Sequence, residues 1–167
     1  MMSANPLENR RPLRDEAVLK YLAGESGSLY YEIQVMLLAA ARKALNTPPG
    51  VEHNMAVESF LVHYRNFRDF LYPPPEAWTN KRYFDDVIAF DYSPEWNVVQ
   101  DDWSGSTPNE KDRIDKLLAH LSYSRPQLEH AWPIPEMLRK IKGSFGEFIL
   151  GLSPVRREWF RVYGDPK

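Results

Sequence analysis

The sequence has no cysteine and almost no net charge. Its 167 residues carry 21 Lys and Arg against 23 Asp and Glu, for a formal net charge of -2 at pH 7. Without cysteine the chain forms no disulfide, thiolate zinc site, iron–sulfur cluster or cysteine nucleophile. The near-neutral balance argues against a broad nucleic-acid-binding surface and against a polybasic membrane anchor. This length suits one domain.

Long apolar runs and glycine-rich motifs are also missing. The longest apolar stretch, Ile33–Ala41, is interrupted by Gln34 and is far shorter than the ~20 residues that span a bilayer. Residues 1–16 contain basic side chains but no apolar segment, so we expect no secretory signal, no membrane partner and a cytoplasmic location. The eight glycines form no phosphate-binding loop or dinucleotide fingerprint, which argues against the common α/β nucleotide-binding classes.

Prolines, by contrast, are frequent, and the 14 of them mostly separate helical segments. No stretch alternates apolar and polar residues in the manner of a strand. The pattern predicts an all-α fold with one domain over 14–167, a bundle of four main helices with short accessory helices, after a flexible N-terminal arm over 1–13. The main helices are expected at 29–45, 51–71, 108 to about 123, after a capping box with Thr107 as the N-cap, and about 136–150, and the short ones at 14–23, 83–91 and 154–162.

Three segments carry further structural expectations. The segment 29–45 is apolar nearly all round, which is typical of a helix in the middle of a bundle. Gly143 and Gly146 predict close packing or a kink inside the last helix. Aromatic side chains in the connection 76–106 are expected to anchor it to the bundle, with protein binding as the alternative: Trp78, Tyr83, Phe84, Tyr92, Trp96 and Trp103.

Two predicted helices carry polar faces that could form a site. On 51–71, aromatic residues cluster on one face, and the candidate binding residues lie on the opposite side: Glu58, Arg65, Asn66 and Asp69. Arg65 and Asp69 are four residues apart and can pair along the helix. This face is either solvated, with one weak ion pair, or covered by a second layer that joins its charges in a network. His63 is predicted to be a packed, hydrogen-bonded histidine.

On 111–123, the candidate catalytic residues Arg113, Lys116 and His120 share a face beside the apolar side chains. A neutral imidazole at this place can act as a general base. Arg113 and Lys116 could bind a phosphate or stabilise its developing charge. The simpler interpretation is two solvated cations next to a boundary histidine.

Two sequence resemblances favour a site. The strings ESFLVHYRNFRDFL (58–71), DDVIAFD (85–91) and RIDKLLAHLSYSR (113–125) resemble a group of uncharacterised bacterial helical proteins over about residues 45–130, from which no activity follows. Arg113-x6-His120 is similar to the signature of HEPN domains, an Arg followed after four to six residues by His. Ile114 departs from the polar residue usual after that Arg, and Arg65-Asn66 has the usual dipeptide without the His.

HEPN domains are all-α, often dimeric, and many are metal-independent ribonucleases. The resemblance implies that His120 takes the proton of an RNA 2′-hydroxyl while Arg113 stabilises the phosphate. Lys116 or Arg125 would bind the flanking backbone, and a homodimer would join two sites. No metal or cofactor is required. The net charge of -2 counts against tight RNA binding.

Two other functions stay open. A metal site is the weaker enzyme hypothesis, because its candidate ligands are poorly spaced: Glu58, His63, Asp85, Asp86, Asp91, His120 and His130. The other alternative is a non-enzymatic interaction or regulatory module, antitoxin-like, with a protein partner.

Overall fold

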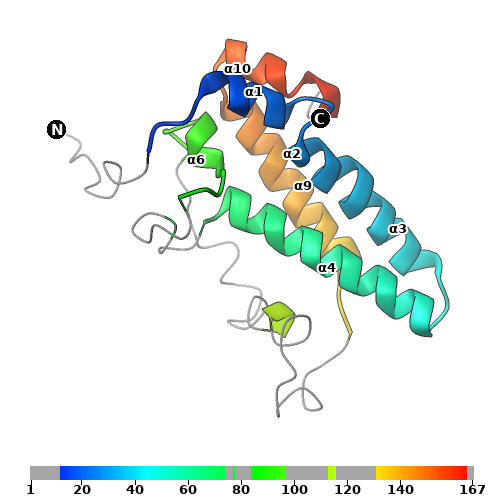
Figure 1. Ribbon diagram of the computed structural model, residues 1–167. Helices are drawn as coiled ribbons and strands as arrows, with labels where there is room; N and C mark the ends of the chain where they lie inside the picture. Colours follow the sequence, from blue (N-terminus) through cyan, green and yellow to red (C-terminus); the bar gives the residue numbers. More distant parts are fainter. Residues whose placement is uncertain (1–11, 74–76, 78–83, 97–112, 116–130, 165–167) are drawn as a thin grey trace.

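A computed structural model describes residues 12–73, 77, 84–96, 113–115 and 131–164. Over these ranges helices are the only regular secondary structure, so the all-α prediction is confirmed. Three long helical runs lie side by side, namely 28–46, α4 (Val51–Leu71) and α9 (Ile134–Gly151) (Figure 1). None of the described helices is both long enough and apolar enough to cross a bilayer.

The predicted main helix from 108 to about 123 is described at residues 113–115, which are helical. The rest of it lies outside the described residues, so the four-helix bundle stays a prediction. The predicted arm is described at Pro12 and Leu13, which are both exposed. The described helices pack around one shared apolar core.

The first long run contains a π-helix. It consists of α2 (Ser28–Tyr30), the π-helix η1 (Tyr31–Leu37) and α3 (Leu38–Asn46), and the N–H of Leu38 bonds to the carbonyl of Ile33, five residues back. Tyr31, Val35 and Leu45 on this run are exposed. One side of this run therefore faces solvent, and its predicted place in the middle of the bundle is wrong. Single apolar side chains are common on protein surfaces, so an apolar segment need not be covered on all sides.

The central helix is α4, which packs against η1, α3, α9 and the short helix α6. Its aromatic face is buried, as the 3.6-residue period predicts, and includes Phe60, Tyr64 and Phe67. The helix begins after Gly50, whose φ of +156° suits glycine, and ends before Pro73. Arg65, Asn66 and Asp69 on its polar face lie beside residues 86–88 of the connection that follows it.

The short helices close one end of the molecule (Figure 1). They are α1 (Glu16–Ala23), α6 (Ala89–Tyr92), α10 (Pro154–Trp159) and the 3-10 helix η4 (Arg161–Tyr163). The predicted helix over 83–91 is thus shorter and later than expected. Its start is fixed by Asp91, whose carboxylate accepts the N–H of Ile88 at 2.9 Å, and residues 84–86 form a turn and a bend instead.

Aromatic residues anchor the connection after α4, as predicted. The hydroxyl of Tyr92 donates to the carbonyl of Leu19, and the indole of Trp96 donates to that of Leu71, each at 2.9 Å. Both rings also pack edge-on against Phe148 of α9. Trp78, Tyr83 and Trp103 lie outside the described residues.

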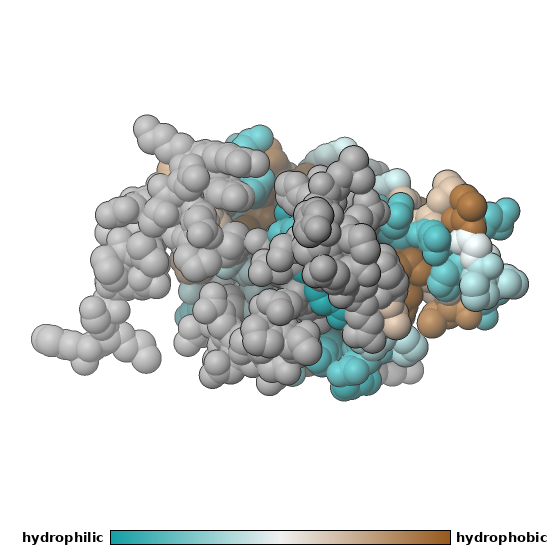
Figure 2. Space-filling view, turned by 90° about the horizontal axis from the view of Figure 1, so that it is seen from below, coloured by the Kyte–Doolittle hydropathy of each residue, from teal (hydrophilic) through white to brown (hydrophobic). Residues whose placement is uncertain are grey.

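Apolar side chains remain exposed where α3 and α4 meet. Leu45, Val51 and Met55 are between 51% and 77% exposed. Figure 2 shows apolar surface at this end of the molecule. We refer to these three residues as the apolar end.

Candidate functional site

Two adjoining hollows follow the C-terminal half of α4, with volumes of about 330 and 350 Å³. Both are lined by Asn66 and Phe70 of α4 and by Val87 of the connection. We refer to the two together as the α4 cleft. The first hollow extends to Glu32 on η1, and the second extends to Pro73 beyond the end of α4.

An ion-pair network centred on Arg65 borders this cleft. The guanidinium of Arg65 lies 2.9 Å from the carboxylate of Asp115 and 3.9 Å from that of Asp69. Asp69 also lies 3.3 Å from the guanidinium of Arg68, which is buried. The predicted pair of Arg65 and Asp69 is confirmed. The contact with Asp115 favours the networked face over the solvated one.

The other candidate binding residues divide between the cleft and its surroundings. Asn66 is exposed and lines both hollows. Glu58 is exposed and lines neither of them, so the structure separates it from Arg65, Asn66 and Asp69. Arg125 lies outside the described residues.

Of the candidate catalytic residues, the structure describes Arg113. Its guanidinium stacks 4.3 Å from the centre of the Trp132 ring and donates to the carbonyl of Ala131 at 3.2 Å. These contacts engage one face and one edge of the guanidinium with the protein itself. Lys116 and His120 lie outside the described residues.

His63 joins α4 to the π-helix. Its Nδ1 lies 2.6 Å from the carboxylate of Glu32, and the side chain is 14% exposed. The predicted packed and hydrogen-bonded role of His63 is confirmed. Within the described ranges, no three His, Asp or Glu side chains gather in a way that could hold a metal ion. His120 and His130 lie outside those ranges.

Carboxylates outnumber cations among the described residues that line the α4 cleft. Glu32 and Asp85 line the first hollow, Asp69 and Asp86 line the second, and the one cation among them is Arg65. Arg14 fixes this segment from the side, donating to the carbonyl of Asp86 at 2.6 Å. The described lining of the cleft thus has more carboxylates than cations, which favours cationic groups over phosphates.

Two acidic residues of the site, Asp115 and Glu32, were not predicted to bind a ligand. Asp115 falls next to the expected apolar face of its helix, and Glu32 sits in a segment that is otherwise apolar. Asp85 and Asp86 were candidate metal ligands, not predicted neighbours of α4. No local pattern marks their meeting with α4, because it depends on how the connection folds back.

Comparisons with known proteins give no further guidance, since no family model, curated protein or solved structure matches this chain. The geometry of the site is therefore the basis for a function.

Proposed function

We propose that this chain is a non-enzymatic interaction or regulatory module, and that its α4 cleft binds a basic segment of a partner protein. The observation that carries the proposal is the network around Arg65. Its guanidinium is held by Asp115 at 2.9 Å and by Asp69 at 3.9 Å. An arginine neutralised by two carboxylates has little positive charge left to attract a phosphate.

The lining of the cleft fits a long basic side chain. Asp85 and Asp86 are exposed, and the rings and methyl groups of Phe70 and Val87 lie among the same lining residues. Lys and Arg side chains combine an apolar stem with a charged head, so the stem would cover the apolar wall while the head meets a carboxylate. The apolar end offers a second surface suited to protein contact.

A binding experiment with three fluorescent probes tests this function. We expect hexa-arginine to bind, and hexaglutamate and hexauridylate not to bind, in fluorescence anisotropy at low salt. The variant Asp85→Asn/Asp86→Asn should weaken hexa-arginine binding about fivefold. The matched control Glu52→Gln/Glu58→Gln removes the same charge from exposed positions of α4 outside the cleft and should leave binding unchanged.

Two results would contradict the proposal. One is hexauridylate binding at least as tightly as hexa-arginine. The other is an equal loss of hexa-arginine binding in the two double variants, since this would mean that overall charge, and not the cleft, attracts the peptide.

A HEPN-like, metal-independent ribonuclease is a second proposal. Its support is the same 2.9 Å contact, which brings the Arg65-Asn66 dipeptide beside the segment that carries Arg113. In that case His120 would be the general base and Lys116 would bind the phosphate. The stacking of Arg113 on Trp132 counts against Arg113 as a phosphate ligand.

RNA degradation in the presence of a chelator tests the second proposal. The ribonuclease predicts cleavage by the wild type and a loss of about a hundredfold or more in His120→Ala, with folding matched by circular dichroism. If neither protein cleaves RNA while both are folded, the ribonuclease proposal fails and the interaction module gains weight.

A further inference from the structure

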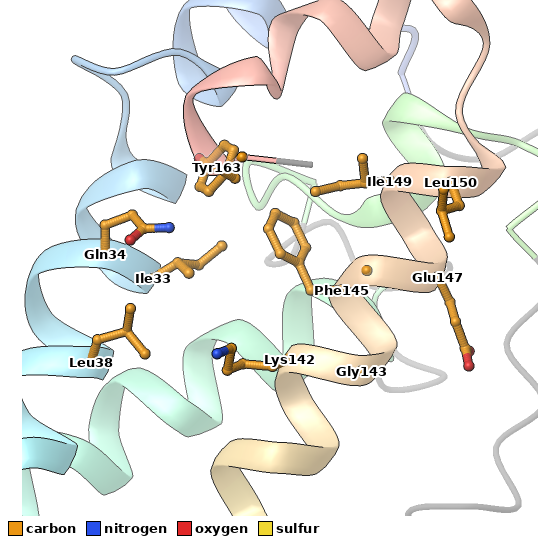
Figure 3. A pocket seen from close by; sticks show the side chains of 12 residues that line it. Ile33, Gln34, Leu38, Lys142, Gly143, Phe145, Glu147, Ile149, Leu150 and Tyr163 are labelled. Atoms are coloured by element: carbon orange, nitrogen blue, oxygen red, sulfur yellow. The ribbon is translucent and has the colours of Figure 1, made fainter. Parts of the chain in front are cut away.

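A larger pocket lies between the π-helix and α9. Its volume is about 560 Å³, within the range of small-molecule sites. Ile33, Phe145 and Ile149 supply apolar walls, and the helices that carry them flank the space (Figure 3). We refer to it as the α9 pocket. None of the described residues that line it also lines the α4 cleft.

The π-helix shapes one wall of the pocket. Its five-residue hydrogen bond from Leu38 to Ile33 widens the helix where Ile33 and Gln34 line the pocket. π-helices are rare in proteins, and those that occur are often found at functional sites. The α9 wall is opened by Gly143, where an added Cβ would meet no atom within 4 Å. The predicted close packing at Gly143 is therefore wrong.

The polar groups of the pocket have a defined arrangement. Figure 3 shows the amide of Gln34 and the ammonium of Lys142 directed into the space between the two helices, and the carboxylate of Glu147 directed away from it. No carboxylate of a described residue pairs with Lys142, whereas Lys140 on the same helix pairs with Glu136 at 3.3 Å. A cation is thus available at the rim of an apolar pocket.

Tyr163 also lines the pocket, and its hydroxyl oxygen is buried. It has no hydrogen-bond partner among the described residues, while its ring packs against Phe145 at 5.1 Å. A buried hydroxyl without a partner costs free energy, so such groups usually bond to water or to a ligand. Because this oxygen has almost no accessible surface, Tyr163 contributes its ring to the pocket wall, and the cation directed into the pocket is Lys142.

We infer that the α9 pocket binds a small amphipathic carboxylate, an acyl chain or ring with one anionic group. The apolar body would lie against Ile33, Phe145 and Ile149, and the carboxylate would meet Lys142 and the Gln34 amide. The inference does not depend on the proposed function, because no described residue lines both sites.

Isothermal titration calorimetry with octanoate and octan-1-ol tests the inference, because the two differ in the charged group alone. We expect octanoate to bind one saturable site and octan-1-ol to bind it about tenfold more weakly. Lys142→Met should remove this difference by weakening octanoate about tenfold without affecting octan-1-ol. Lys140→Met, the matched control on the same helix, should change neither affinity.

A second pair of variants tests the location. Gly143→Leu should fill the pocket and abolish binding of both probes, whereas Gly151→Leu, at the end of α9 and outside the pocket, should leave both unchanged. Both changes replace a helical glycine, where an added Cβ would meet no atom within 4 Å, by a better helix former, so both variants should fold, as checked by circular dichroism.

The inference is overturned by any of three results. They are no saturable octanoate binding to the wild type, equal affinity for octanoate and octan-1-ol, and equal binding to the Gly143→Leu and Gly151→Leu proteins.

Discussion

Single side chains decide the character of the α4 cleft. Arg65 would be a phosphate ligand if it were free, but Asp115 and Asp69 lie close to its guanidinium. Arg113 would be one as well, but it stacks on Trp132. Both cations therefore serve contacts within the protein, and the carboxylates Asp85 and Asp86 of the lining are exposed.

A double-mutant cycle measures the contact between Arg65 and Asp115. The side chains are 35% and 26% exposed, so solvent screens the pair. We expect Arg65→Gln and Asp115→Asn to show a coupling of about 0.5–1 kcal/mol in urea unfolding, decreasing in high salt. Arg161 and Glu158, 3.8 Å apart and highly exposed, provide a control pair with less coupling. A coupling near zero for the first pair would mean that this contact does not hold residues 113–115 against α4.

At the scale of elements, two glycines differ in the space around them, one at a turn between helices and one within a helix. Gly27 precedes α2, where the chain turns back after α1. A Cβ at Gly27 would lie 2.1 Å from the carbonyl oxygen of Leu22, and no such approach is tolerated. Gly143 lies within α9 beside open space. Glycine is thus required at Gly27, where there is no room for a side chain, but not at Gly143, where there is room.

These two glycines should respond to alanine in opposite directions. Gly27→Ala forces backbone apart and should lower the free energy of unfolding by about 2–3 kcal/mol. Gly143→Ala should raise it by about 0.5–1 kcal/mol, because alanine reduces the entropy of the unfolded chain and favours the helix. Urea unfolding followed by circular dichroism measures both. Equal effects at the two positions would contradict the close approach at Gly27.

At the scale of the whole molecule, one aromatic core joins the ends of the chain. Phe148 is fully buried and packs on the rings of Tyr92 and Phe160, while Arg156 of α10 pairs with Glu16 of α1 at 2.9 Å. Burial raises the pKa of Tyr92 above its ordinary value, and the charge of Asp91 adds to the effect. Burial likewise raises the pKa of Tyr163, with smaller contributions from Tyr92 and Tyr30.

These two tyrosines make the fold sensitive to alkali. In the unfolded chain they lose their protons near pH 10, whereas in the folded protein they keep them to higher pH. Their contribution to stability is therefore complete below pH 10 and is lost as the pH rises above it. We expect the free energy of unfolding to fall by about 1.4 kcal/mol per pH unit for each tyrosine.

Urea unfolding at a series of alkaline pH values checks this expectation. Tyr163→Phe should remove about half of the slope, because the buried hydroxyl of Tyr92 alone would remain. A slope that is the same in the variant would show that other groups cause the loss of stability.

Much of the secondary structure could be read from the chain itself. The period of the aromatic residues and the flanking Gly50 and Pro73 define α4, since helix faces and helix ends are local properties. Asp15 defines the start of α1 in the same way, by accepting the N–H groups of Ala17 and Val18. The helical pairing of Arg65 with Asp69 follows from spacing alone.

Tertiary structure alone decided the contacts between segments that are distant in the sequence. The pairing of Arg65 with Asp115 and that of His63 with Glu32 join residues 50 and 31 positions apart, and no local pattern specifies either of them. The same holds for the open space beside Gly143, because glycine permits both close packing and a gap. Local sequence determined where α4 forms and which of its faces is buried. The packing of those helices determined which polar groups neutralise each other and where pockets remain.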